Sequence, residues 1–323
     1  MKIQGSKKTA VIVLVIFVTI LLVVLGIVLY SNYAKKYPEE PLKMKNLGVT
    51  EENIDISMLS IDNNIKDVPV YFIEPKVHIT QVEQIIDRMS LKLERKDIIS
   101  NSYIEWSDKE NTFTYDAVTD SVSFQLTKRI TLERGEESFA HAFKKYLDLD
   151  YEFKLIKEKR NSDGGITYYG ARLLEDVPVQ YGAGYEYSDI LQFDSQGNLI
   201  AGQMLLAEIK KYDIYLPLIS RSELDKYINT KEYPKENYTD SSVLVDTLKL
   251  DYLNDQWEEI EDTLEGCIAQ DSELLFMYKT SNQGYLLPVY KISSNCTVKY
   301  EKQEYTVPAL FYVNAADPRY ITL

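Results

Sequence analysis

The chain has 323 residues, a net charge of −14, and 45% hydrophobic and 12% aromatic residues. This composition is typical of a protein with a packed core rather than a disordered chain, and the length exceeds one typical domain. The negative charge opposes contact with phosphate backbones, so nucleic acid is excluded as an expected partner.

The first predicted element is a transmembrane helix at residues 10–30, AVIVLVIFVTILLVVLGIVLY. This uncharged run, at about 1.5 Å per residue, matches the roughly 30 Å thickness of the hydrocarbon core of a bilayer. The alternative, a cleaved signal peptide, has a shorter apolar core and a small-residue cleavage site, which residues 30–33 do not offer. We therefore expect an integral membrane protein with one span.

Length and charge predict the orientation of this helix, because the flanking basic residues are nearly balanced. They are Lys2, Lys7 and Lys8 before the helix and Lys35, Lys36, Lys43 and Lys45 after it. The tail at residues 1–9 is short enough to stay in the cytoplasm, and the remainder of the chain is strongly acidic. We expect a cytoplasmic N-terminus and an extracytoplasmic body at the cell membrane.

Residues 31–54 are expected to form a stalk, because prolines and charges occur there without an apolar period. The stretch DVPVYFIEP from Asp67 alternates apolar residues and predicts a short strand. Thr80 and Glu83 match a capping box followed by apolar residues at helical spacing, so a helix is expected to begin there. A strand meander is predicted over residues 102–131, and a second helix within SFAHAFKKYLDL.

The second half of the chain contains turn and cap signals. Polar turns with glycine predict hairpins at residues 162–165, 194–198 and 282–284. A calcium loop is the alternative at 194–198, but this segment supplies few carboxylates at alternate positions. Ser220 and Glu223 match a second capping box, which predicts another helix.

The repeated order of strands, capped helix and further strands predicts an α+β fold with two lobes. We expect one lobe at residues 55–150 and the other at residues 151–323, each a curved antiparallel sheet packed with a helix. The similarity between VPVYFIE and LPVYKIS is faint, so a duplication is only a hypothesis.

The two cysteines, Cys267 and Cys296, have two interpretations. In an oxidising compartment they can close a disulfide worth about 3–4 kcal/mol, and otherwise both are small buried core residues. No paired CxxC motif or Cys/His cluster is present, so no metal is expected.

The sequence contains no recognisable catalytic motif. Its two histidines, His78 and His141, lie on unrelated predicted elements and are interpreted as core or surface residues. Carboxylates are abundant, but nothing singles out a catalytic pair. We therefore predict a protein that is not an enzyme, without catalytic residues or cofactors.

Tyrosine is in excess, with 26 residues, many of them at alternate positions of predicted strands. Tyrosines on an open sheet can line a groove for a saccharide or a peptide. The alternative is that tyrosine is simply a good strand former.

From Gly165 onward the chain resembles the carboxy-terminal half of the YycH/YycI-type membrane-anchored regulators. The segments that carry the resemblance are GITYYGARLLEDVPVQYG, YSDILQFDSQGNLIAGQMLL, YLPLISRSELDKYI, LLPVYKI and YTVPALFYVNA. The resemblance implies PepSY-like lobes and a non-enzymatic protein that modulates a membrane sensor kinase through contacts between transmembrane helices. The 163–165 hairpin, the acidic stretch near Asp255 and the cysteine pair depart from this pattern.

Two functional hypotheses follow. The first is a membrane-anchored extracytoplasmic binding or regulatory protein with a sensor kinase as partner. Its span would contact the partner helix near Thr19 and Gly26, the only threonine and the only glycine of the run. The second is a cell-envelope module that binds a peptide or glycan along a tyrosine-rich sheet.

Overall fold

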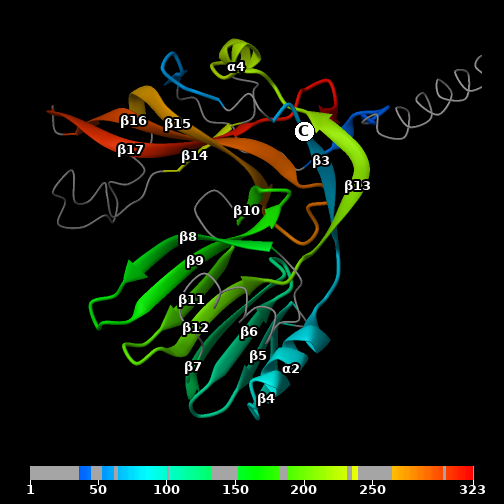
Figure 1. The fold of residues 1–323 in the computed structure, drawn as a ribbon, viewed down its shortest axis with the longest axis vertical. Helices are drawn as coiled ribbons and strands as arrows, with labels where there is room; N and C mark the ends of the chain where they lie inside the picture. Colours follow the sequence, from blue (N-terminus) through cyan, green and yellow to red (C-terminus); the bar gives the residue numbers. More distant parts are fainter. Residues whose placement is uncertain are drawn as a thin grey trace, which may run out of the picture.

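The structure is a computed structural model, and it describes residues 36–44, 53–61, 65–99, 102–131, 152–181, 188–230, 235–238, 264–300 and 303–322. These residues form a mainly β protein with two short helices, arranged in two lobes (Figure 1). The predicted span with Thr19 and Gly26 lies outside the described residues, as do His141, the helix expected around it and the acidic stretch near Asp255. Among the described residues, no helix has the length and hydropathy needed to cross a membrane.

The lower lobe in Figure 1 is an antiparallel sheet with one helix, α2 (Ile79–Arg88). Its strands, in sheet order from the inner edge, are β9 (Ile166–Leu174), β11 (Asp189–Phe193), β12 (Asn198–Leu205), β7 (Ser121–Thr131), β6 (Thr112–Asp116), β5 (Tyr103–Ser107) and β4 (Glu94–Ile99), and β8 (Glu152–Arg160) also pairs with β9.

One face of this sheet is apolar and holds the core of the lower lobe. Alternate residues point to one face of a strand, so Phe113 and Phe124 on neighbouring strands face inward, where their rings stack at 5.1 Å. Val82 and Ile85 of α2 pack into the same cluster. Residues at the alternate positions, such as Ser123 and Gln125 of β7, are exposed and lie on the opposite, open face of the sheet.

The upper lobe contains the longest strands. They are β15 (Leu264–Tyr278), β16 (Leu287–Tyr300) and β17 (Gln303–Asn314). In the same sheet β14 (Lys235–Tyr238) pairs with β17 and β2 (Ile54–Asp55) pairs with β15, while β1 (Leu42–Lys43) and β18 (Ile321–Thr322) form a separate two-stranded sheet. Helix α4 (Arg221–Tyr227) packs on this sheet through Leu224 and Ile228. Ser220 and Glu223 form the predicted capping box at its start, so that prediction is confirmed.

Two connections make the lobes continuous. β10 (Val177–Tyr181) pairs with β9 and also, in parallel, with β15, so a single mixed sheet of 14 strands runs through both lobes. β3 (Asp67–Glu74) and β13 (Glu208–Pro217) form a separate antiparallel pair along one side of the molecule (Figure 1).

The described part of the fold is less divided than expected, while the two helices that the sequence predicts within it are present as α2 and α4. The prediction of two purely antiparallel lobes misses the parallel contact between β10 and β15, which joins segments about a hundred residues apart. Residue 150 does not separate the two cores, because β7 pairs with β12 and one apolar cluster holds residues from both sides of this position.

Two local expectations are also corrected. Part of the expected stalk belongs to the folded body, because the amides of Leu42 and Met44 donate to carbonyl oxygens of Tyr320 and Thr322, both at 2.9 Å. Helix α2 begins one residue before Thr80, with His78 at its N-cap position and no side-chain cap. Contacts of His78 with another element, described below, fix this start instead of a local capping box.

Candidate functional site at the junction of the lobes

Two of the described segments carry the chain between the lobes. β3 leads into α2 through residues 75–78, and β12 leads into β13 through Leu206 and Ala207. Leu206 and Ala207 are buried, as is Leu205 before them. Their backbone polar groups are shielded from water and need partners within the protein.

Arg172 and Asp189 hold the second crossover in place. Arg172, a fully buried residue of β9, donates from Nη1 to the carbonyl oxygen of Ala207 at 2.7 Å and from Nη2 to that of Leu205 at 3.1 Å. Oδ1 of Asp189 accepts from the amide of Leu205 at 3.2 Å, and its Oδ2 accepts from the hydroxyl of Ser188 at 2.6 Å. A buried cation and a buried carboxylate thus fix the same short segment.

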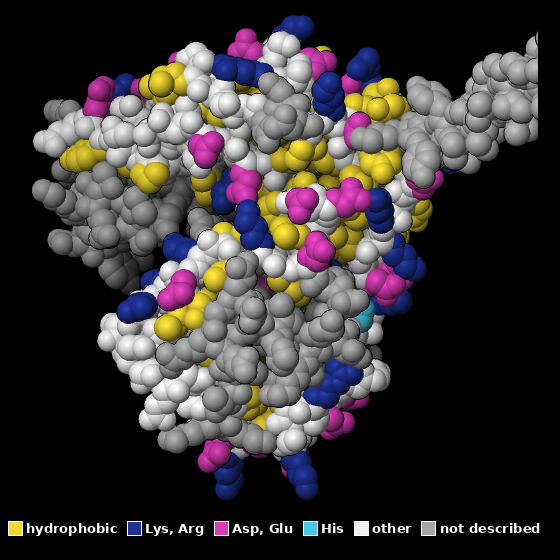
Figure 2. All heavy atoms as spheres, in the orientation of Figure 1, with side chains coloured by type: hydrophobic (Ala, Val, Ile, Leu, Met, Phe, Trp, Pro, Cys, Tyr) yellow, Lys and Arg dark blue, Asp and Glu magenta, His cyan; other side chains and the backbone are white. Residues whose placement is uncertain are grey.

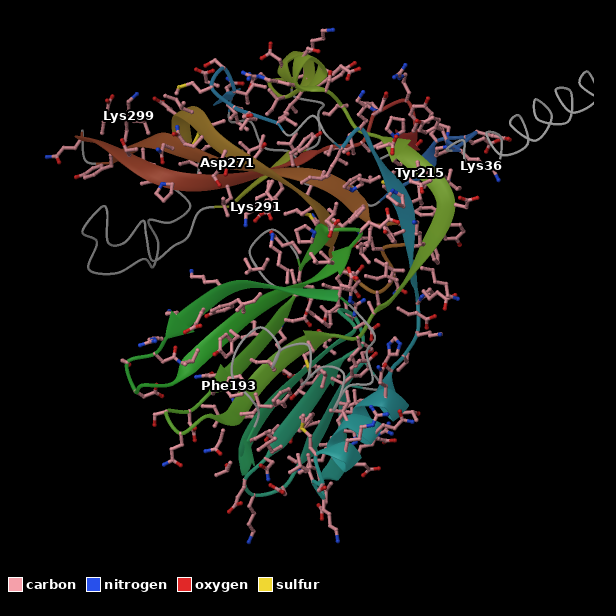
Figure 3. The ribbon with its side chains drawn as sticks, in the orientation of Figure 1. Lys36, Phe193, Tyr215, Asp271, Lys291 and Lys299 are labelled. Carbon is pink, nitrogen blue, oxygen red and sulfur yellow. A yellow bond between two sulfur atoms is a disulfide. The ribbon has the colours of Figure 1, made fainter. Side chains whose placement is uncertain are left out.

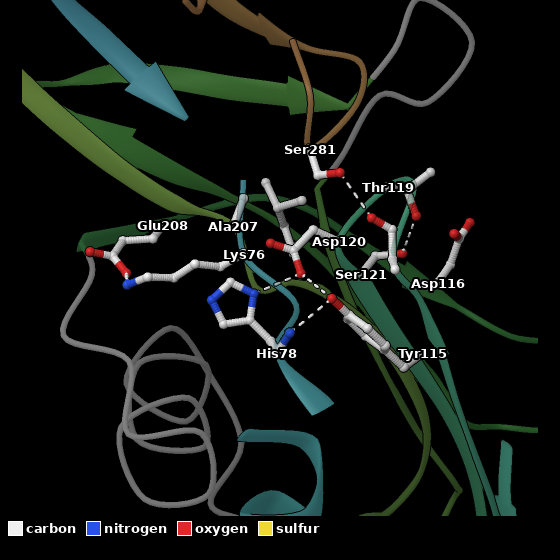
Figure 4. A network of polar contacts seen from close by, with 12 residues as sticks. Lys76, His78, Tyr115, Asp116, Thr119, Asp120, Ser121, Ala207, Glu208 and Ser281 are labelled. Atoms are coloured by element: carbon white, nitrogen blue, oxygen red, sulfur yellow. Dashed lines mark hydrogen bonds and ion pairs between the residues drawn. The ribbon is translucent and has the colours of Figure 1, made fainter. Parts of the chain in front are cut away.

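Asp120 connects this crossover with the first one. Its backbone carbonyl accepts from the amide of Leu206 at 2.8 Å. Its carboxylate Oδ1 lies 2.8 Å from Nδ1 of His78 and accepts from the hydroxyl of Tyr115 at 2.8 Å (Figure 4). The same Tyr115 hydroxyl accepts from the backbone amide of His78 at 3.0 Å, so the start of α2 is tied to the turn between β6 and β7.

The turn that carries Asp120 is also held by the upper lobe. Ser281, in the connection between β15 and β16, donates to the carbonyl oxygen of Val118 from its hydroxyl at 3.1 Å and from its amide at 2.9 Å. The hydroxyl of Tyr278 donates to the carbonyl oxygen of Thr119 at 3.0 Å. Burial raises the pKa of Tyr278, so this hydroxyl stays protonated at physiological pH.

Charged pairs surround the crossovers at the surface. Lys76 pairs with Glu208 (Figure 4), and Lys210 pairs with Glu74. Acidic and basic side chains are interspersed over the face shown in Figure 2. Exposed pairs of this kind contribute at most about 1 kcal/mol each, so the buried network sets the geometry of the junction.

The pKa of Asp189 makes the junction sensitive to pH. Burial raises this pKa from 3.8 to about 6, against hydrogen bonds and the nearby Arg172 that lower it. The folded state therefore binds the proton more tightly than the unfolded chain does. The resulting stabilisation is fully present below about pH 4 and is lost as the pH rises through about 6.

Replacing Asp189 with asparagine is expected to remove this pH dependence. Relative to D189N, the native protein should lose about 3 kcal/mol of unfolding free energy between pH 4 and pH 7, as measured by chemical denaturation. Asp194 provides a control of opposite sign, because its bond from Asn198 lowers its pKa. Compared with D194N, the native protein should lose stability as the pH falls. If the difference in unfolding free energy from the native protein changed with pH in the same way for D189N and D194N, the raised pKa of Asp189 would be contradicted.

The junction supplies hydrogen-bond donors and acceptors that fix two lobes relative to each other. Oδ2 of Asp120 is buried and has no hydrogen-bond partner among the described residues. A buried carboxylate with one unsatisfied oxygen depends strongly on the hydrogen bonds that its other oxygen makes. Because Asp120 holds both crossovers, we expect them to open together. Over the same described ranges, no three His, Cys, Asp or Glu residues are grouped to hold a metal ion.

The residues singled out from sequence lie elsewhere. Cys267 and Cys296 are joined in a disulfide between β15 and β16, one of the two states that the sequence left open. Six of the described tyrosines are buried in the cores and therefore do not line an open sheet. These are Tyr71, Tyr115, Tyr168, Tyr278, Tyr290 and Tyr312.

Sequence reasoning missed the junction almost completely. The sequence indicates only a core or surface role for His78, whereas its contact with Asp120 joins positions separated by 42 residues. Arg172 and Asp189 belong to no recognisable sequence motif. The only local signal is their type, since an arginine or an aspartate within an apolar strand needs a buried partner.

The fold and junction define a mainly β protein of two lobes joined by a buried polar network. No family model matches the chain, and no match is found among curated proteins. Among solved structures, it is similar to an uncharacterized protein from Eubacterium rectale ATCC 33656, with 12% identity and a TM-score of 0.47 over 84% of this chain and 90% of that one.

A second solved structure that is similar to the chain is YycH from Bacillus subtilis. The identity is 12% and the TM-score is 0.31, over 84% of this chain and 53% of that one, so the chain spans about half the length of YycH. This distant likeness does not place the chain in the YycH family.

Proposed function

We propose that this chain is a membrane-anchored extracytoplasmic protein that acts by binding and regulation rather than by catalysis. In this proposal residues 10–30 span the membrane once and contact a membrane protein, with a sensor kinase as the expected partner. The two lobes lie outside the cell, and the junction couples them to the anchor.

The observation that carries this proposal is the route from the expected anchor into the junction. The carbonyl oxygen of Lys36, six residues after the apolar run, accepts from the amide of Tyr215 on β13 at 2.7 Å, and the two residues lie together in Figure 3. β13 runs from Tyr215 back to Glu208, next to the buried crossover. A displacement of the lower lobe would therefore reach the base of the anchor along a single strand.

Two further features support the extracytoplasmic and regulatory parts of the proposal. The disulfide between Cys267 and Cys296 is of the kind that persists in oxidising compartments. Within the apolar run, Gly26 and Thr19 are small residues seven positions apart, which places them on one face of a helix and allows close approach of a second helix.

The test is capture of partners from native membranes after crosslinking. The intact chain is compared with a variant whose residues 10–30 are replaced by an unrelated membrane helix, and with Gly26→Leu. We expect a sensor kinase with the intact chain, and at least about tenfold less with either variant, because close helix packing is lost. Val28→Leu is the matched control, since residues two apart lie on opposite sides of a helix.

Capture of the same partner with the unrelated helix would place recognition in the folded body. That result would contradict regulation through the span and would favour the second hypothesis, a cell-envelope module for a peptide or glycan.

A further inference from the structure

The open face of the lower sheet contains a site that goes beyond the proposed regulatory function. Two neighbouring hollows, of about 390 Å³ and 550 Å³, lie over β6, β7, β11 and β12. They share Gln125, Gln192 and Ala201, so they form one continuous groove. Hollows of this size are typical of sites for small ligands.

The register of the strands brings uncharged polar side chains together in this groove. In one row across the sheet, Thr112 lies opposite Gln125, and Ala201 lies between Gln125 and Gln192. In the next row, Ser123 lies between Thr114 and Gln203. Residues opposite each other on paired strands share one face, so all of these side chains point to the groove.

Ala201 makes the surface concave at its centre. Its methyl group stands between two long side chains, those of Gln125 and Gln192, so the middle of the row is lower than its sides. The groove is thus made by the choice of residues in the row and not by a loop.

The charge of the groove is unusual for this protein. Charged residues make up 27% of the chain, yet no residue that lines the smaller hollow is charged. Glu110 and Asp194 line the larger hollow only. A neutral ligand fits this arrangement, whereas an anionic polymer would meet carboxylates and the overall charge of −14.

The chemistry of the lining favours a ligand rich in hydroxyl groups. Glutamine amides, serine and threonine each donate and accept hydrogen bonds, as does every sugar hydroxyl. An extended peptide would instead add to a free sheet edge through its backbone. β6, β7, β11 and β12 each have a strand on both sides, so their backbone groups are already paired.

We propose that this groove binds a neutral glycan, with the amides of Gln125 and Gln192 and the hydroxyls of Thr112, Thr114 and Ser123 as hydrogen-bond partners. The four strands give a track of about 14 Å across the sheet, which suits a short oligosaccharide. This site does not depend on a kinase partner, so it stands or falls separately from the function proposed above.

The test measures binding of defined oligosaccharides to the full chain in lipid nanodiscs, because glycoside detergents would themselves present sugars. The probes are neutral oligomers of glucose and of N-acetylglucosamine, an anionic galacturonate oligomer and an uncharged serine-glycine peptide. We expect millimolar or tighter binding of a neutral oligosaccharide and none of the anionic oligomer.

Two groove variants identify the site. Q125A/Q192A removes two amide partners and should weaken binding at least about tenfold, and Ala201→Leu should abolish it by filling the hollow. Gln270→Ala, an exposed glutamine on β15 of the upper lobe, is the matched control and should leave binding unchanged. Unchanged thermal midpoints show that the variants are folded.

Three results would overturn the proposal. These are no binding of any neutral oligosaccharide at millimolar concentration, binding that the groove variants leave unchanged, and binding of the peptide in place of the glycans. Loss of kinase capture in the experiment above has no bearing on these results.

Discussion

Replacing Arg172 with methionine is expected to lower the free energy of unfolding by about 3–5 kcal/mol, because it breaks a buried charged network by removing one partner. The carbonyl oxygens of Leu205 and Ala207 would lose their donors inside the protein. Asp189 would also lose the nearby positive charge that lowers its pKa, so its carboxylate would become costlier to keep ionised.

Chemical denaturation of the full chain at pH 7 measures this effect, with Arg95→Met as the control. Arg95 is partly exposed and pairs with Glu83 at 3.5 Å, so its replacement should cost less than about 1 kcal/mol. The double variant R172M/D189N should be destabilised by less than the sum of the two single variants. Either single replacement leaves the charge of the other residue unpaired, whereas the double replacement removes both charges. Equal losses for Arg172 and Arg95 would contradict the structural role given to the junction.

Local sequence signals predicted the parts of the fold that local chemistry determines. The hairpins at residues 162–165 and 194–198 are confirmed, since β8 pairs with β9 and β11 pairs with β12 across them. In the second, Gly197 has a φ of 86°, and the Asp194 carboxylate accepts from the Asn198 amide at 2.8 Å. Glycine and aspartate are needed there whatever the surroundings, so the pattern is informative by itself.

Signals that depend on distant contacts were less reliable. Thr80 and Glu83 match a capping box, yet α2 starts at Ile79 because the backbone amide of His78 binds Tyr115 on another strand. At Ser220 no such competing contact intervenes among the described residues, and the local cap is formed as predicted. The same motif thus succeeds or fails according to tertiary contacts that the sequence does not display.

The candidate sites depend on register, which explains why they were not predicted. Thr112, Gln125 and Gln192 are ordinary strand residues in the sequence, and only the pairing of β6, β7, β12 and β11 places them in one row. A shift of one residue in any pair would turn that side chain to the opposite face. Sequence periodicity indicates that a residue is exposed, but not which exposed residues become neighbours.

Removing the disulfide is expected to destabilise the upper lobe by about 3–4 kcal/mol, the chain-entropy effect of a loop with the 29-residue separation of Cys267 and Cys296. Both cysteines are buried, so the variant C267A/C296A is preferable to reduction, which requires prior opening of the lobe. Hydrogen exchange of the full chain should be faster at amides of β15 to β17. It should change little at β5 to β7 of the lower lobe, which serve as the internal control.

The position of this disulfide makes the effect relevant to the anchor as well. Cys267 is bonded to Cys296 of β16 and also lies opposite Ile54 of β2, the strand at which the expected stalk ends. Loss of the bond should therefore also speed exchange at Ile54 and Asp55. If exchange increases in both lobes alike, the lobes unfold as one unit. If it increases in neither, the strand ladder alone holds this part of the sheet, and the bond does not contribute the expected stability.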